Sequence, residues 1–481
     1  MEFRSVCAGM LCLVVANVVR ADEPPVSYSG FRAVRVQTPT ARDALAVAAL
    51  APVGLECEVA PGVREVAVSP EAWDAFVGLH LEHRVLHDDL GAWIELEKAQ
   101  PPTDGFVSRD LAWFSAFKNL ASIESRHAAI AAQFPTLVSR SVIGTTLQNR
   151  SIYALKVSAP DSPSNPRSQR AQFVINGTQH AREWITPMTV MWALEKLTEG
   201  YGVDPRITAI MNEVEFLIVP VANPDGYSYT WTNDRYWRKN MRLVGTLPRG
   251  VDLNRNWAAF WGQDDSGSSP NPQSQTYRGT APFSEPESAA LSAFITANPN
   301  VRAHIDVHSY GRFLLYAPGW TEANAAYVEA YQGISANVRA AILASPGLSY
   351  TAGPAGSTLY LVNGGAADWS HIHRRAWSWV WELRGTDFVL PAAEIVPCAQ
   401  EIFAGFLVVA EGLSGCQLRL DFNRDGSISP LDVDEYFSLL GEGPCTRESS
   451  FGCGSLDFNL DGQIDPGDVD AYFVALGEGG C

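Results

Sequence analysis

The chain has 481 residues, which is too long for one ordinary domain, so two or three domains are expected. Hydrophobic residues make up 46% of it, enough for a large core. The formal net charge of −18 argues against a nucleic acid as partner, because a phosphate backbone is bound mainly through basic side chains.

The N-terminus, residues 1–21, is predicted to be a secretory signal. Arg4 makes the start positive, residues 6–19 are largely apolar, and the run ending at Ala21 is suited to cleavage. This apolar run is too short for a membrane span, and no later segment is expected to be long enough. The protein is therefore expected to be secreted, without a membrane span, into a compartment that permits disulfides.

Residues 22–98 are predicted to form a small α+β domain. Two segments have the alternation of strands and two have the apolar pattern of helices. The strands are expected over 31–36 and 64–68, and the helices over 41–50 and 70–81. Residues 99–112, which are rich in loop-forming residues at their start, are predicted to be an exposed linker.

Strands and helices alternate over residues 113–413, which predicts one large α/β domain with a mostly buried sheet. Residues 172–175 form a short apolar run typical of a buried strand, and a helix is expected to follow over 184–201. His180 and Glu183 lie between these two elements, where ligand sites of open α/β sheets usually occur.

His308 follows another apolar, strand-like run, residues 301–307. It supplies a second nitrogen to the nitrogen of His180 and the oxygen of Glu183. Two histidines and one carboxylate, with a fourth position left for water, are the ligand set of a catalytic zinc site. The three residues therefore predict one Zn²⁺ and a hydrolase.

Seven motifs carry a resemblance to a known family. In chain order they are His180-Ala-Arg-Glu-Trp184, Asn223-Pro-Asp-Gly-Tyr227, Trp237-Arg-Lys239, Gly250-Val-Asp-Leu-Asn-Arg-Asn-Trp257, Ser284-Glu-Pro-Glu287, His308-Ser-Tyr310 and Glu382-Leu-Arg384. The chain resembles the pancreatic-type zinc carboxypeptidases, the A/B group of the M14 metallopeptidases. The resemblance implies an α/β fold with a mixed, eight-stranded type of sheet flanked by helices. Residues 22–98 also resemble the activation propeptide of that group.

The resemblance assigns the catalytic residues. Glu382 corresponds to the general base that takes a proton from the zinc-bound water and returns it to the leaving amine. Arg238 corresponds to the arginine that stabilises the oxyanion. Without the motifs, Glu382 would be interpreted as a buried partner of Arg384, and Arg238 as part of a solvated basic patch.

The resemblance also assigns substrate contacts. Arg255 would bind the free α-carboxylate of the substrate, because its planar fork matches a carboxylate. Asn254 and Tyr360 would complete this grip, with Tyr360 on a glycine-rich loop. Arg182 would contact the substrate further upstream; a structural role is the alternative.

The resemblance also implies a position for Ala367, at the floor of the pocket for the C-terminal side chain, where a basic-specific enzyme would need an acid. It places three apolar residues nearby, Leu359, Val362 and Val380, so that the pocket favours an apolar or aromatic side chain. It places Asp306 at a wall position that is often small and neutral, where this residue could admit basic side chains. The alternative is that Asp306 bonds a neighbouring main-chain group.

Residues 416–481 contain 13 acidic and 3 basic residues and a repeat with a period of 36 residues. Both copies follow the spacing of calcium loops, with an Asp in place of the usual final Glu. The predicted ligands of two Ca²⁺ are Asp421, Asn423, Asp425, Ser427 and Asp432, and then Asp457, Asn459, Asp461, Gln463 and Asp468. The tail resembles a dockerin-type module; acidic turns without calcium are the alternative.

One disulfide is expected in each repeat, Cys416–Cys445 and Cys453–Cys481, although crossed pairing stays open. The tail would bind a cohesin-like or cell-surface partner. The whole sequence predicts a secreted zymogen of a zinc metallocarboxypeptidase that acts on the free C-termini of peptides or proteins. Activation would follow cleavage by another protease within 99–112, for example after Arg109.

The sequence argues against two further functions. The set of Asn254, Arg255 and Tyr360 argues against a murein-peptide peptidase on the same fold, because this set recognises an ordinary C-terminal carboxylate. The complete ligand set and Glu382 argue against an inactive binding protein targeted by its tail.

Overall fold

A computed structural model describes residues 25–51, 57–60, 62–99, 111–163, 166–245, 247–323, 328–345, 347–414, 432–434, 437 and 466–477. The predicted signal, nearly all of the linker, and the tail cysteines lie outside these ranges. Of the ten predicted calcium ligands, Asp432 and Asp468 are described.

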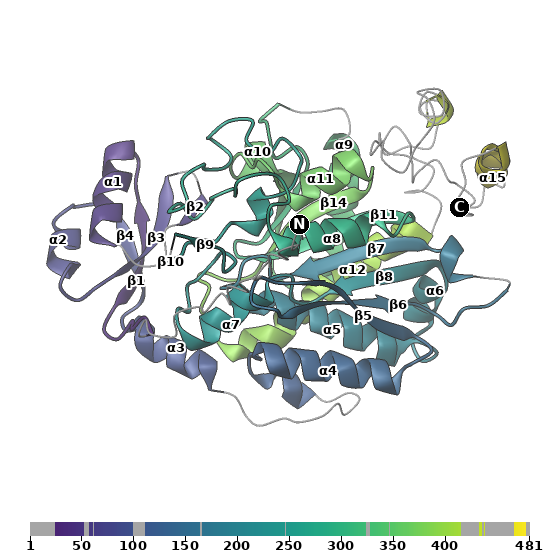
Figure 1. Cartoon of the computed structure of the whole chain (residues 1–481), viewed down its shortest axis with the longest axis horizontal. Helices are drawn as coiled ribbons and strands as arrows, with labels where there is room; N and C mark the ends of the chain where they lie inside the picture. The colour runs from purple at the N-terminus through teal and green to yellow at the C-terminus, as the bar shows by residue number, and fades with distance from the viewer. Residues whose placement is uncertain are drawn as a thin grey trace, which may run out of the picture.

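The N-terminal domain is a four-stranded sheet in the order β2-β3-β1-β4, with three helices (Figure 1). Thr40 and Asp43 form a capping box, which explains why the first helix begins where the sequence predicts. The second helix is shorter than the predicted 70–81. The elements are β1 (Arg32–Gln37), α1 (Ala41–Leu50), β2 (Cys57–Ala60), β3 (Val63–Val68), α2 (Trp73–Val77), β4 (His83–His87) and α3 (Leu90–Lys98).

The larger domain is built on a mixed eight-stranded sheet in the order β13-β12-β14-β11-β7-β8-β6-β5, which confirms the predicted fold class. Its four central strands, β14, β11, β7 and β8, are parallel to one another. The strands are β5 (Val138–Thr145), β6 (Ser151–Val157), β7 (Ala171–Gly177), β8 (Val214–Val219), β11 (Val301–Ser309), β12 (Phe313–Tyr316), β13 (Thr351–Pro354) and β14 (Trp377–Leu383).

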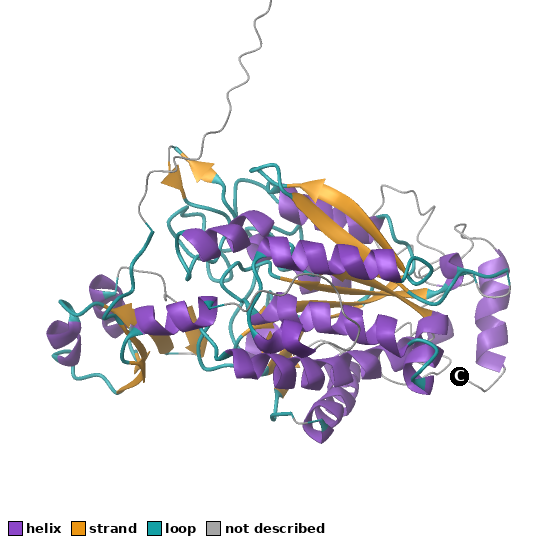
Figure 2. Cartoon of the chain, turned by 90° about the horizontal axis from the view of Figure 1, so that it is seen from below, coloured by secondary structure: helices purple, strands orange, loops and turns teal. Residues whose placement is uncertain are grey.

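Helices cover both faces of this sheet (Figures 1 and 2). The α-helices of the larger domain are α4 (Leu120–Gln133), α5 (Ile185–Gly200), α6 (Pro205–Glu213), α7 (Pro224–Thr232), α8 (Pro286–Thr296), α9 (Val328–Ala344), α10 (Ala355–Thr358), α11 (Ala366–His373) and α12 (Ile395–Ser414). The shorter elements are η1 (Leu111–Ser115), η2 (Arg167–Gln169), η3 (Leu253–Arg255), η4 (Ala392–Glu394), β9 (Leu243–Val244) and β10 (Leu247–Pro248). In the tail, α15 spans Pro466–Gly477.

The sheet separates two apolar cores, because neighbouring residues of a strand point to opposite faces. On β7, Phe173 and Ile175 pack into the core shared with α4, α5, α6, α9 and α12. Val174 points the other way, into the core shared with α8 and α11. The strand is therefore buried on both sides, which is why its sequence is an unbroken apolar run.

Helix α12 is the described helix that, together with η4, is long and apolar enough to cross a membrane by length and composition (Ala392–Ser414). The expectation that no later segment reaches this length is therefore wrong. Half of its apolar window is buried inside the fold, where residues such as Phe406 pack in the larger core. A helix with this burial is a core helix of the α/β domain.

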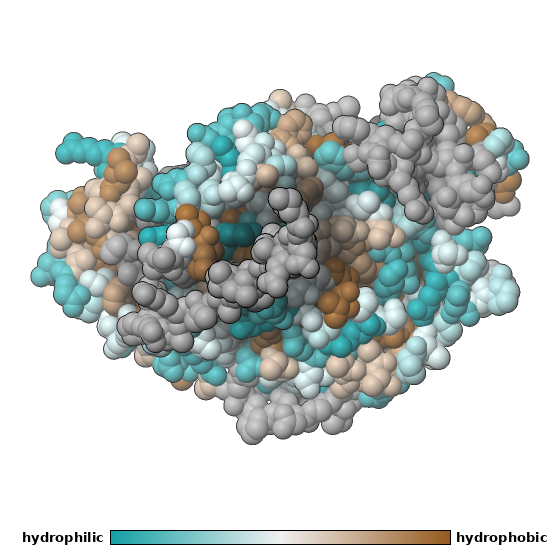
Figure 3. All heavy atoms as spheres, viewed as in Figure 1, coloured by the Kyte–Doolittle hydropathy of each residue, from teal (hydrophilic) through white to brown (hydrophobic). Residues whose placement is uncertain are grey.

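The N-terminal domain packs against the larger domain through an apolar contact and a buried ion pair. The apolar contact joins Tyr28, Ala33, Ala67, Leu90 and Ile94 to Tyr236, Phe388 and Val389. Beside it, Glu97 on α3 accepts two hydrogen bonds of 2.5 and 2.8 Å from Arg235. On the face seen in Figure 3, hydrophobic residues gather over the N-terminal domain at the left, while hydrophobic and hydrophilic residues are mixed over the other coloured parts.

Candidate active site

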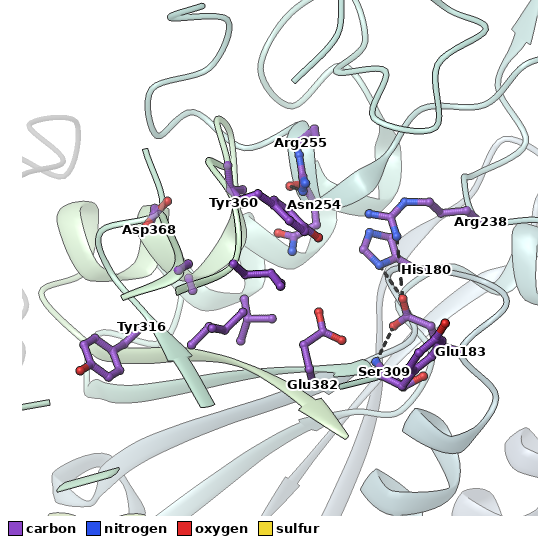
Figure 4. A pocket seen from close by; sticks show the side chains of 18 of the residues that line it. His180, Glu183, Arg238, Asn254, Arg255, Ser309, Tyr316, Tyr360, Asp368 and Glu382 are labelled. Carbon is purple, nitrogen blue, oxygen red and sulfur yellow. Dashed lines mark hydrogen bonds and ion pairs between the residues drawn. The ribbon is translucent and has the colours of Figure 1, made fainter. Parts of the chain in front are cut away.

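Three neighbouring parallel strands bring the predicted site residues to one edge of the sheet. His180 and Glu183 follow the carboxyl end of β7, and His308 lies near the end of β11. Glu382 lies near the end of β14, directly opposite His308 in the strand register. Because parallel strands end at the same edge, the structure brings these four residues together. Figure 4 shows three of them, His180, Glu183 and Glu382, around the cavity.

His180, Glu183 and His308 form a candidate metal centre. All three are buried, and one donor atom from each lies within 4.8 Å of the others. Nδ1 of His180 is 2.8 Å from one oxygen of Glu183, and Nδ1 of His308 is 3.2 Å from the other. The two Nδ1 atoms are 2.9 Å apart. Both imidazoles therefore direct the same type of nitrogen at one point.

The far nitrogens of both rings are held by carboxylates. Nε2 of His180 lies 3.0 Å from Asp252, and Nε2 of His308 lies 2.7 Å from Asp306. The main-chain N–H of Ser309 donates to Glu183 at 3.0 Å. Carboxylates behind metal-binding histidines fix the ring orientation and raise the basicity of the ligating nitrogen. The donor set and its supports therefore fit zinc.

The structure contradicts the prediction that Asp306 forms a wall of the specificity pocket. Its side chain is fully buried beneath His308. Besides His308 it accepts hydrogen bonds from Asn176 at 2.6 Å and from Gln179 at 2.5 Å. The alternative of a main-chain partner is not what is observed either, because all three partners are side chains. Asp306 supports a metal ligand.

Arg238 is 8% exposed and lines the cavity in front of the metal ligands. Its guanidinium donates from Nε and Nη2 to Asp252 at 3.2 and 2.9 Å, so this carboxylate orients both Arg238 and His180. The arginine is thus buried and ion-paired, unlike the solvated patch weighed from the sequence. Its place suits a cation that faces a developing oxyanion.

Glu382 also lines the cavity, and burial raises the pKa of its carboxyl to about 8, while His308 lowers it and Glu183 raises it further. It is not the partner of Arg384, the alternative weighed from the sequence. Arg384 instead pairs with Glu401 at 2.6 Å and with Glu394 at 2.8 Å. Glu382 is therefore placed to exchange a proton within the cavity.

Asn254, Arg255 and Tyr360 line the same cavity. Arg255 donates from Nε to the carbonyl of Gly267 at 2.8 Å and from Nη1 to that of Asn254 at 2.9 Å. Its Nη2 makes no hydrogen bond to any described residue. The Tyr360 ring centre lies 5.9 Å from the guanidinium carbon. Two main-chain carbonyls thus hold Nε and Nη1 of Arg255, and Nη2 is left to donate into the cavity.

The cavity has a volume of about 850 Å³, counting its open mouth. Away from the metal ligands its lining is mostly apolar and is formed by Leu315, Ala355, Leu359, Val362, Ala367 and Val380. Four of these are the residues that the sequence placed in the specificity pocket: Leu359, Val362, Ala367 and Val380. Cavity residues to which the sequence assigned no role include Tyr310, Asp368 and Phe388.

Arg182 does not line the cavity. It is fully buried, with its guanidinium 4.1 Å from the ring centre of Phe388. A contact between Arg182 and the substrate stays a prediction.

Sequence reasoning assigned no role to Asp252, although it lies within one of the seven motifs. Two features of the sequence point to a role for Asp252. A histidine ligand needs a partner for its second nitrogen. Asp252 also precedes Asn254 by two residues, which places it at the site if Asn254 is there.

A buried two-histidine, one-carboxylate centre beside a positioned acid and arginine, on an open α/β sheet, defines a zinc-dependent hydrolase. Similarity to known proteins supports this class. The model of the zinc carboxypeptidase family, peptidase M14, matches residues 123–405. Over 337 residues the chain is 35% identical to carboxypeptidase A4 of Mus musculus, covering 69% of this chain and 78% of that one. It is 32% identical to carboxypeptidase A1 of Rattus norvegicus, covering 73% and 83%.

Solved structures extend this similarity. Thrombin activatable fibrinolysis inhibitor matches with a TM-score of 0.73 at 26% identity, over 80% of this chain and 99% of that one. Carboxypeptidase A from Helicoverpa armigera matches with a TM-score of 0.68 at 25% identity, over 80% and 98%. The chain therefore belongs to the zinc carboxypeptidase family and is a metallocarboxypeptidase, as the sequence predicted.

The placement of Asp306 generates a test. Asp306→Asn should lower the affinity for Zn²⁺ about 10- to 100-fold, because a neutral amide supports the ligating imidazole less well. Competition with a chromophoric chelator measures this directly. The preference among C-terminal residues should stay as in the wild type. Asp265→Asn, at an exposed carboxylate, is the matched control. A changed preference at unchanged zinc affinity would restore the pocket-wall role.

Proposed function

We propose that this zinc carboxypeptidase removes apolar or aromatic residues from the C-termini of peptides and proteins, and that it is secreted as a zymogen. The observation that carries the substrate assignment is the apolar lining around Ala367, in the same cavity that Arg255 lines. An apolar C-terminal side chain gains free energy by leaving water for such a lining. The apolar run within residues 1–21 supports secretion.

When bound, Zn²⁺ polarises the scissile carbonyl and lowers the pKa of a water molecule. The remaining steps fall to side chains of this chain. Nη2 of Arg255 and the amide of Asn254 bind the terminal carboxylate, which sets the last peptide bond opposite Glu382. Glu382 takes a proton from the attacking water and passes it to the leaving amine. Arg238, fixed by Asp252, stabilises the negative charge on the carbonyl oxygen.

Glu382→Gln tests the role of the base. The amide has nearly the same shape but cannot accept a proton, so turnover should fall at least about 100-fold while zinc content stays near one per chain. Steady-state hydrolysis of a peptide with a free C-terminus, together with metal analysis, measures both. Full turnover by Glu382→Gln would remove Glu382 as the base.

The zymogen proposal is supported by the position of the N-terminal domain. Phe388 lines the cavity and also packs in the apolar contact with that domain. Arg235 donates to Glu97, to the carbonyl of Phe388 at 2.8 Å and to the carbonyl of Arg182 at 2.7 Å. One buried pair therefore joins the N-terminal domain to the cavity rim and to the metal-binding segment. By its name, one structural relative is activatable by thrombin.

Glu97→Gln should weaken the contact between the N-terminal domain and the larger domain in the uncleaved chain. Removing one partner of a buried ion pair costs about 3–5 kcal/mol, because the other charge is left uncompensated. The uncleaved variant should therefore hydrolyse a small peptide at least about 10-fold faster than the uncleaved wild type. Glu95→Gln changes an exposed carboxylate on the same helix and should not.

Cleavage within 99–112 supplies an internal control for this test, because it yields catalytic domains of identical sequence from wild type and variant. Their activities should then be equal and higher than that of the uncleaved wild type. An uncleaved Glu97→Gln chain as inactive as the wild type would contradict the proposed role of the pair.

We also propose that residues 416–481 bind two Ca²⁺ and dock the enzyme onto a cohesin-like or cell-surface partner. The support is the repeated ligand spacing in the sequence. Calorimetric titration of the full chain with Ca²⁺ should show two binding events, both lost in the double variant Asp421→Ala and Asp457→Ala. The absence of any calcium heat would refute the loops.

A further inference from the structure

Two of the residues proposed to bind the substrate carboxylate come from segments that are far apart in sequence. Arg255 ends η3, whereas Tyr360 lies in the loop 359–365 between α10 and α11, called the Tyr360 loop below. Figure 4 shows the two side chains together on one side of the cavity. Their relative position depends on what joins the two segments. A turn over residues 264–267 contacts both of them.

The main-chain carbonyl of Gly267 joins Arg255 to the Tyr360 loop. It accepts a hydrogen bond from Nε of Arg255 at 2.8 Å and a second one from the main-chain N–H of Asn363 at 3.2 Å. Asn363 is the third residue after Tyr360 and is fully buried. One oxygen atom therefore fixes the guanidinium of Arg255 relative to the end of this loop.

The close approach of the turn to the loop requires glycine at position 267. A methyl group placed on Gly267 would lie 2.7 Å from both the main-chain nitrogen and Cγ of Asn363. Non-bonded carbon atoms attract each other best at about 3.5–4.0 Å, so a larger residue would push the Tyr360 loop away from the turn.

The side chain of Asp264 closes the turn and contacts the same loop. Its Oδ1 accepts hydrogen bonds from the hydroxyl of Ser266 at 2.6 Å and from the main-chain N–H of Ser266 at 2.9 Å. It also accepts one from Nδ2 of Asn363 at 2.8 Å. These hydrogen bonds, those from Ser266 first, hold the pKa of Asp264 below its ordinary value. Asp264 is therefore an ionised acceptor at neutral pH.

The next carboxylate in the chain has a different partner. Asp265 is exposed and pairs with Arg278 at 2.8 Å. Among the described residues it makes no hydrogen bond to the Tyr360 loop or to Arg255. Asp265 therefore provides a matched control for Asp264, from the same turn and with the same charge.

We propose that Asp264 and Gly267 are positioning residues for the substrate carboxylate and hold Arg255 and the Tyr360 loop at the separation that this carboxylate requires. Neither of them is among the described residues that line the cavity, so they act through Arg255 and Tyr360. This inference rests on the proposed function, because it needs a substrate with a free C-terminus.

Removal of the Asp264 contact should raise KM more than it lowers kcat. Binding of the terminal carboxylate weakens, while the metal ligands and Glu382 keep their own contacts. The contact is one hydrogen bond to a charged acceptor, and its loss corresponds to about a tenfold change in affinity.

The experiment uses the zinc-loaded, proteolytically processed enzyme, a peptide with a free C-terminus and two competitive inhibitors. N-acetyl-leucine carries the terminal carboxylate, whereas acetohydroxamic acid binds zinc without one. In Asp264→Ala, KM for the peptide and the inhibition constant of N-acetyl-leucine should each rise about tenfold. The inhibition constant of acetohydroxamic acid and the zinc content should stay as in the wild type. Gly267→Ala should show the same pattern.

Two further variants separate this role from general damage to the turn. Asp264→Asn keeps an oxygen that accepts from Ser266 and Asn363, so it should restore most of the affinity that Asp264→Ala loses. Asp265→Ala should behave as the wild type, because an exposed ion pair contributes little free energy.

Unchanged KM and inhibition constants in Asp264→Ala would overturn the proposal. An equal weakening of both inhibitors, or the same loss in Asp265→Ala, would overturn it as well. Failure of the proposed function gives a different result, already in the wild type. That enzyme would hydrolyse the C-terminally amidated peptide as fast as the free one, and N-acetyl-leucine would not inhibit it.

Discussion

The active site depends on the parallel alignment of β7, β11 and β14. These strands are not consecutive in sequence, yet their hydrogen-bond register sets His308 beside Glu382 and brings the segment after β7 to the same edge. The strands are buried on both faces, so a shift of one residue would turn apolar side chains into the wrong core. Packing of the two cores therefore fixes the positions of the metal ligands and the base.

Two buried carboxylates orient the side chains of the active site. Asp252 holds both His180 and Arg238, and Asp306 holds His308 while it is itself held by Asn176 on β7. The charges of Asp252 and Asp306 both have partners, as burial of ions requires. Asp368 differs because its partner is a main-chain N–H.

Much of the fold and site could be predicted from the sequence, and the misses share a physical cause. The strand–helix junction around His180, the bounds of α1 and the family motifs are local signals. Asp306 was misjudged because its partners Asn176 and Gln179 are about 130 residues away in sequence. The burial of α12 within the core also depends on distant segments. Periodicity and spacing carry no information about such contacts.

The carboxylates behind the two imidazoles have a consequence for how the metal is exchanged. Each carboxylate bonds Nε2, the ring nitrogen that does not face the metal site, so the orientation of both rings depends on the fold and not on the ion. A centre of this kind is preorganised, and little conformational entropy is lost when zinc enters it. Zinc can then dissociate and bind again reversibly at a preformed site, without unfolding and refolding of the chain.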